Sequence, residues 1–71
     1  MKERIKKVVS QVLKTDVDDN TSQNTCASWD SLHHLNLIVE LETEFDISFE
    51  PEEIAIMKSI DAIERMIETK K

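Results

Sequence analysis

The chain has 71 residues, a length that corresponds to one small domain. A domain of this size buries only about 60% of its unfolded surface, so a deep catalytic cleft is not expected. The net charge of −6 disfavours contact with the phosphates of nucleic acids, and the absence of glycine excludes the glycine-dependent phosphate-binding loops of nucleotide-binding proteins.

The spacing of apolar residues predicts a first helix over residues 2–14. Its buried face is expected to consist of Ile5, Val8, Val9, Val12 and Leu13. Residues 15–30 are rich in Asp, Asn, Ser and Thr, whose side chains hydrogen-bond locally in turns, so they predict a loop. A loop of this length in so small a domain is often functional.

A second helix is predicted over residues 31–45. Its apolar residues form one broad stripe, which consists of Leu32, Leu35, Ile38, Val39, Leu41 and Phe45. Asp30 and Ser31 both suit the N-cap, because a short side chain with an oxygen atom accepts hydrogen bonds from the first N–H groups of a helix.

The segment Glu50–Glu53 predicts a short third helix, with Pro51 in its first turn. The apolar residues expected to pack inward from it are Ile54, Ile56 and Met57. Ser59 is expected to cap a last helix whose inner face consists of Ile60, Ile63 and Ile67. The predicted fold is therefore all-α, a small antiparallel bundle of three longer helices and one short helix that forms one domain over residues 1–71.

Cys26 is the single cysteine, so it can form neither an internal disulfide nor a zinc site alone. This favours a reducing, cytoplasmic compartment. No apolar run approaches about 20 residues, and no apolar segment follows the N-terminal cations. We therefore expect no transmembrane segment and no signal peptide.

Four other chemistries are disfavoured by residue type or spacing. Asp16, Asp18 and Asn20 match the first positions of a calcium loop, but glycine and glutamate are absent further along it. His33 and His34 are adjacent, so they cannot chelate one ion from a helix, and we interpret both as surface histidines.

Ser31 and His34 share a helix face, but no nucleophile elbow or oxyanion hole accompanies them. Cys26 lies in an acidic stretch, which disfavours a reactive thiolate. The sequence therefore predicts no catalytic residue, no metal ligand and no enzymatic activity.

The acidic residues are concentrated in the middle of the chain. Residues 15–57 contain eleven acidic residues and no Lys or Arg. We expect the cations of the first helix to face this segment, and the remaining acidic charge to suit a partner with a basic surface.

The motif Trp29-Asp30-Ser31-Leu32 stands where the long loop meets the second helix. A serine at an exposed helix start offers a hydroxyl where a phosphate is favoured by free N–H groups and by the helix dipole. The neighbouring Asp30 suits a divalent cation during phosphoryl transfer.

Together with Leu41-Glu42, Glu44-Phe45 and Asp46-Ile47 downstream, this motif resembles the acyl carrier protein family over essentially the whole chain. The resemblance implies that Ser31 carries 4′-phosphopantetheine, added from coenzyme A by a separate phosphopantetheinyl transferase. It further implies that acyl groups travel as thioesters on this arm between acyl-loading and acyl-using enzymes of a fatty-acid, polyketide or other specialised pathway.

The resemblance also implies a partner surface along the second helix and the short third helix, where basic patches of enzymes meet Asp30, Leu32, Leu35, Val39, Glu42, Phe49 and Glu53. It implies an acyl pocket inside the bundle, with the candidate lining residues Leu41, Met57 and Ile60. His33-His34-Leu35-Asn36 departs from the acidic and small residues usual after the motif. Trp29 and His34 on either side of it resemble stand-alone carriers of specialised pathways.

Two alternatives remain open. An aminoacyl or peptidyl carrier protein would use the same arm for a different cargo. An unmodified acidic helical adaptor would dock a basic protein, and its Ser31 would only cap the second helix.

Overall fold

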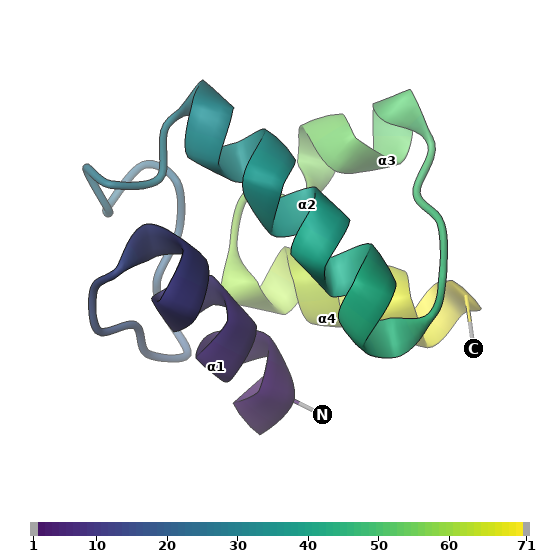
Figure 1. Cartoon of the computed structure of the whole chain (residues 1–71), viewed down its shortest axis with the longest axis horizontal. Coiled ribbons are helices and arrows are strands. Elements are labelled where there is room, and N and C mark those ends of the chain that lie inside the picture. The colour runs from purple at the N-terminus through teal and green to yellow at the C-terminus, as the bar shows by residue number, and fades with distance from the viewer. Residues whose placement is uncertain (1, 71) are drawn as a thin grey trace.

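The computed structural model describes residues 2–70 and, within that range, contains four helices and no β-strand (Figure 1). Three helices are long and one is short, which confirms the predicted all-α class. Helix α1 packs against both α2 and α4. The helices are α1 (Lys2–Leu13), α2 (Ser31–Phe45), α3 (Pro51–Ile56) and α4 (Ile60–Lys70).

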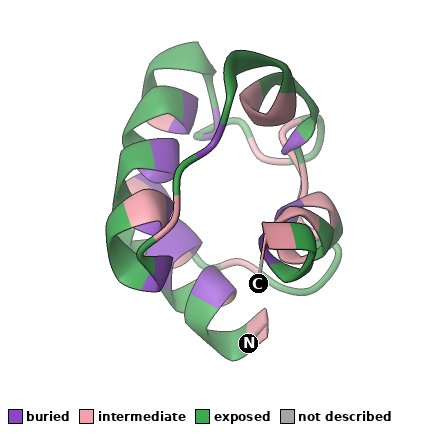
Figure 2. Ribbon diagram, turned by 90° about the vertical axis from the view of Figure 1, so that its right-hand side faces the viewer, coloured by how far each residue is buried: buried purple, intermediate pink, exposed green. Residues whose placement is uncertain are grey.

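One hydrophobic core joins the helices. Figure 2 shows the buried segments turned toward the interior and the exposed segments outside. The core side chains come from α1, α2, α4 and the connecting segments, namely Ile5, Val8, Val9, Leu13, Trp29, Leu37, Ile38, Leu41, Phe45, Phe49, Met57, Ile60, Ile63 and Ile67. The predicted inner faces of α1 and α4 are confirmed, with Val12 at the edge of the core.

Both α1 and α2 end on a residue in the left-handed conformation. Lys14 has φ 56° and ends α1 at Leu13, one residue earlier than predicted. Asp46 has φ 55°, and its backbone N–H donates to the carbonyl of Glu42. Glycine usually occupies such positions, and aspartate tolerates them because its short polar side chain hydrogen-bonds locally.

The long loop before α2 is docked on the segment that leads into α4. The N–H of Gln23 donates to the carbonyl of Lys58 at 2.7 Å, and the N–H of Ile60 donates to the carbonyl of Thr21 at 3.2 Å. Ser22 and Ser59 form an isolated β-bridge in the same region. The loop thus has a defined path toward the start of α2.

Helix α3 starts at Pro51, as predicted, and the side chain of Glu53 accepts a hydrogen bond from the backbone N–H of Glu50. None of its six residues is buried. Ile54 is half-buried, but Ile56 is 61% exposed, so the prediction that Ile56 packs inward is wrong. Residues two apart on a helix lie on opposite faces, so one short helix cannot turn both isoleucines toward the core.

The start of α4 agrees with the sequence. The hydroxyl of Ser59 accepts a hydrogen bond from the N–H of Ala62 at 3.1 Å, which confirms the predicted cap. Two cations of α1 face the acidic segment as expected, because Lys6 pairs with Asp19 and Arg4 pairs with Glu44.

Lys2, in contrast, pairs with Asp61 of α4 at 2.9 Å.

Within residues 2–70, no helix has the length and apolar character needed to cross a bilayer.

Candidate functional site

The N-cap of α2 is Asp30. Its backbone is extended, and its carboxylate accepts a hydrogen bond from the N–H of His33 at 2.9 Å. This bond, followed by the hydrogen bond from the His33 ring at 2.8 Å, holds the pKa of Asp30 below its usual value. Ser31 is the first residue inside the helix. The sequence suggested both residues for the cap, and the structure assigns that role to Asp30 alone.

The side chain of Ser31 has no structural role within the described part of the chain. Ser31 is exposed, and its hydroxyl forms no hydrogen bond with residues 2–70. It lies in the first turn of a 15-residue helix, where the partial positive charge of the helix dipole favours a negatively charged group. The hydroxyl is therefore open to an electrophile presented by an enzyme that modifies hydroxyls.

Directly beneath this turn lies a buried polar relay. The indole Nε1–H of Trp29 donates to Nδ1 of His34 at 2.9 Å, and Nε2 of His34 lies 2.8 Å from the carbonyl oxygen of Ile54 in α3. Trp29 is 1% exposed and His34 is 9% exposed. The interpretation of both histidines as surface residues is therefore wrong for His34, because its position on α2 turns it toward the core.

The same two hydrogen bonds show whether His34 could act as a base for Ser31. Both ring nitrogens of His34 are engaged, one by Trp29 and one by Ile54. His34 is therefore not available as a base for Ser31. Within residues 2–70, no group of three or more His, Cys, Asp and Glu residues is placed to hold a metal ion.

The broad apolar stripe predicted for α2 divides into two faces. The inner face consists of the buried residues His34, Leu37, Ile38, Leu41 and Phe45. The outer face consists of Leu32, Leu35 and Val39, which are 67%, 57% and 57% exposed. These three follow Ser31 along the surface of α2, so the apolar residues that α2 contributes to the expected partner surface are accessible.

The acidic residues expected on the partner surface are engaged inside the chain. The carboxylate of Glu42 accepts a hydrogen bond from the backbone N–H of Phe49 at 2.8 Å. Glu53 pairs with Lys70 at 2.8 Å, and this ion pair, followed by the hydrogen bond from the backbone N–H of Glu50, lowers its pKa.

Phe49 does not lie on the surface, contrary to expectation. Its ring is 8% exposed and joins the core, with Nζ of Lys70 at 5.8 Å from the ring centroid. The hydrogen bond from its backbone to Glu42 fixes this segment next to the end of α2. The exposed part of the expected surface therefore consists of Asp30 and the outer face of α2, whereas Glu42 and Glu53 are half-buried.

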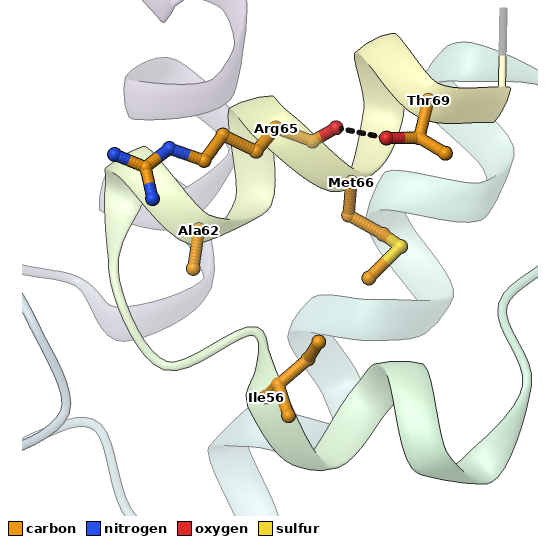
Figure 3. Close-up of a pocket in the computed structure, with 5 residues that line it drawn as sticks. All are labelled: Ile56, Ala62, Arg65, Met66 and Thr69. Carbon is orange, nitrogen blue, oxygen red and sulfur yellow. Dashed lines mark hydrogen bonds between the residues drawn. The ribbon is translucent and has the colours of Figure 1, made fainter.

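The three candidate lining residues of an acyl pocket, Leu41, Met57 and Ile60, are fully buried in the core. A groove of about 300 Å³ lies elsewhere, between the end of α3 and α4. Figure 3 shows Ile56 of α3 facing Ala62 and Met66 of α4, with the Arg65 side chain extending along α4. The remaining lining residue, Thr69, donates its hydroxyl to the carbonyl of Arg65.

Sequence reasoning missed the part played by Trp29 and His34. The signal was present, because His34 precedes Leu37, Ile38 and Leu41 by three, four and seven residues, the spacing of one helical face. A histidine within an apolar stripe needs buried hydrogen-bond partners, and the tryptophan five residues earlier supplies one. No protein-family model matches this chain, so its function must be inferred from these residues.

Proposed function

We propose that this chain is an acyl carrier protein, in which Ser31 accepts 4′-phosphopantetheine and the arm carries acyl groups as thioesters. The observation that carries the proposal is the Ser31 hydroxyl, which is exposed at the start of α2 and forms no hydrogen bond with residues 2–70. Capping does not account for this serine, because Asp30 caps the helix. The sequence motif and the geometry thus favour the same atom.

The residues around Ser31 fit a phosphodiester. The hydroxyl is unobstructed, and the first turn of α2 favours negative charge there. The Asp30 carboxylate is ionised near neutral pH, and its hydrogen bonds from His33 lower its pKa further, so it suits the role of ligand for the divalent cation that accompanies coenzyme A. When bound, the arm supplies a flexible chain that ends in a thiol.

In the attachment step, Oγ of Ser31 attacks the phosphorus atom that bears the pantetheine. The new Oγ–P bond replaces the P–O bond within the pyrophosphate of coenzyme A, and adenosine 3′,5′-bisphosphate leaves. The serine proton passes to a base of the transferase. His34 cannot accept it, because both of its ring nitrogens are engaged. The chain itself contributes the hydroxyl, its orientation and the adjacent carboxylate.

Partner enzymes are expected to contact the outer face of α2, which begins next to Ser31 and consists of Leu32, Leu35 and Val39. An exposed row of aliphatic side chains beside a modification site suits an apolar recess on a partner. Leu35→Asp is expected to lower kcat/KM of the transferase by about tenfold, a loss of ~1.4 kcal/mol in transition-state binding, without changing the fold. An unchanged kcat/KM would contradict this surface.

The experiment that tests the proposal is an intact mass measurement. The purified chain is incubated with coenzyme A, Mg²⁺ and a broad-specificity phosphopantetheinyl transferase. We expect the native chain to gain the mass of one phosphopantetheine, and Ser31→Ala to gain nothing. Ser28→Ala is the matched control, because Ser28 is also exposed but precedes the motif, and it should be modified like the native chain.

If a folded native chain gains no mass with two unrelated transferases, the carrier proposal is wrong and the acidic adaptor takes its place. The aminoacyl or peptidyl carrier makes the same demands on Ser31. It is separated from the acyl carrier by the cargo that partner enzymes load onto the thiol.

A further inference from the structure

Helix α3 is held by the half-buried side chain of Ile54, which packs against the core, and by polar contacts. It has six residues and none of them is buried. A helix of this length is not stable alone in water, so tertiary contacts must hold it in place. Two such contacts are present on its inner side: the hydrogen bond between His34 and the Ile54 carbonyl, and the ion pair between Glu53 and Lys70.

The buried relay allows one protonation pattern for His34. An indole Nε1–H can only donate, so Nδ1 of His34 must be the unprotonated nitrogen that accepts from Trp29. The ring proton therefore resides on Nε2, and it donates to the carbonyl of Ile54. Trp29 thus selects the tautomer that can hold α3.

We propose that His34 is a positioning residue that anchors the end of α3 to the inner face of α2, with Trp29 fixing its tautomer. The anchored carbonyl also accepts a hydrogen bond from the N–H of Met57 at 3.3 Å, so it belongs to the last turn of α3. Carbonyls at a helix C-terminus carry partial negative charge and lack helical partners, which makes the imidazole N–H a suitable donor.

The anchor sets the width of the groove between α3 and α4. Ile56 forms the α3 side of that groove and lies only two residues beyond Ile54, opposite Ala62 and Met66 (Figure 3). The ion pair of Glu53 with Lys70 is the other polar contact, and both of its side chains are 22% exposed, whereas His34 is 9% exposed. His34 bonds to Ile54, two residues before Ile56, so it sets where the end of α3 lies, and in the carrier proposed above it sets which α3 surface a partner meets beside α2.

The test uses the full, unmodified chain, so its result does not depend on whether Ser31 can be modified. Trp29 is the single tryptophan, and its indole N–H gives one NMR signal. Long-range ¹H–¹⁵N spectra of the native chain should show His34 with its proton on Nε2. A proton on Nδ1 would overturn the proposal without any substitution.

Amide hydrogen exchange then measures how strongly the bond from His34 protects the end of α3. His34→Phe keeps an apolar ring but removes both hydrogen bonds. We expect the amides of Ile54 and Met57 to exchange about tenfold faster, and the methyl signals of Ile56 and Met66 to shift, while the core amides of α1 keep their protection. His33→Phe is the matched control, because within residues 2–70 the His33 ring bonds only to Asp30, and it should leave α3 unchanged.

Two further variants separate positioning from general stability. Trp29→Phe should leave α3 partly protected, with both His34 tautomers populated. His34→Gln, whose amide can both donate and accept, should recover part of the protection lost in His34→Phe. Equal loss of protection in all four helices, or unchanged protection of α3 in His34→Phe, would show that His34 does not position α3.

Discussion

Two adjacent histidines of α2 have opposite surroundings. The His33 ring is partly exposed and donates to the carboxylate of Asp30, the N-cap residue three positions earlier. The His34 ring is buried and joins three segments, from Trp29 through α2 to Ile54 in α3. Successive helical residues point about 100° apart. Position on the helix, and not residue type, therefore decides which histidine bonds to a near neighbour and which bonds to residues distant in the chain.

The same division runs along the rest of α2. Leu35 and Leu37 are two residues apart and chemically identical, but Leu35 is 57% exposed and Leu37 is 0% exposed. The inner face stabilises the fold, whereas the outer face leaves aliphatic surface in water beside Ser31. Exposed aliphatic side chains grouped in this way indicate contact with another molecule.

The largest effect that distinguishes the two faces is expected from leucine truncation. Leu37→Ala should lower the free energy of unfolding by about 2–5 kcal/mol, because it removes buried methyl groups and leaves a cavity. Leu35→Ala should change it by no more than about 0.5 kcal/mol. Urea denaturation followed by circular dichroism measures both. Equal losses would mean that α2 is not oriented as described.

The next effect concerns the buried relay. Trp29→Phe should lower the free energy of unfolding by about 1–3 kcal/mol, since Nδ1 of His34 loses its buried donor. His33→Phe should have a much smaller effect. A double-mutant cycle of Trp29→Phe with His34→Phe should give a coupling energy clearly different from zero. Strict additivity would contradict the bond between the two side chains.

A smaller effect is expected from pH at the cap of α2. His33 hydrogen bonds lower the pKa of Asp30 in the folded chain from its ordinary value of 3.8. The unfolded chain therefore binds this proton more readily. The stabilisation is present above the ordinary value and is lost as pH falls through the folded pKa.

The melting temperatures of the native chain and of Asp30→Asn measure this contribution. The native chain should be the more stable one at about pH 6, and the gap should narrow by about pH 2. Asp16→Asn, at an exposed loop position, is the control and should show no such change. A gap that widens in acid would contradict the cap.

The smallest effect is expected at the second attachment of α3. Glu53→Gln removes the ion pair with Lys70, which also lowers the pKa of Glu53. The melting temperature should fall only slightly at low salt, and the difference should vanish near about 1 M salt. A loss as large as that of Trp29→Phe would mean that the ion pair, and not His34, is the main anchor of α3.

Much of the fold could be predicted because local signals and packing agree there. Pro51 starts α3, Ser59 caps α4, and Ile60, Ile63 and Ile67 form a buried face, all as their spacing and residue type indicate. The motif around Ser31 also falls at the start of a helix, as predicted. At these positions one short segment of sequence contains all the information that its conformation requires.

The errors occurred where a second segment decides the outcome. Whether Phe49 is exposed depends on the hydrogen bond from its backbone to Glu42 and on the packing of its ring in the core. Ile56 was assigned inward on hydrophobicity, but a short helix anchored at Ile54 turns it outward. Local spacing shows that Ile54 and Ile56 cannot both turn inward, but the contact with α2 decides which of them does, and the burial of Phe49 follows from no local spacing.

The sequence by itself determined the helices, the cap of α4 and the serine that begins α2, and it limited the cap of α2 to Asp30 or Ser31, because helix formation and capping depend on residues within a few positions of one another. Only the tertiary structure decided which face of α2 is buried and that His34 bonds across to α3. These outcomes depend on contacts between residues distant in the chain, which exist only after the helices have packed.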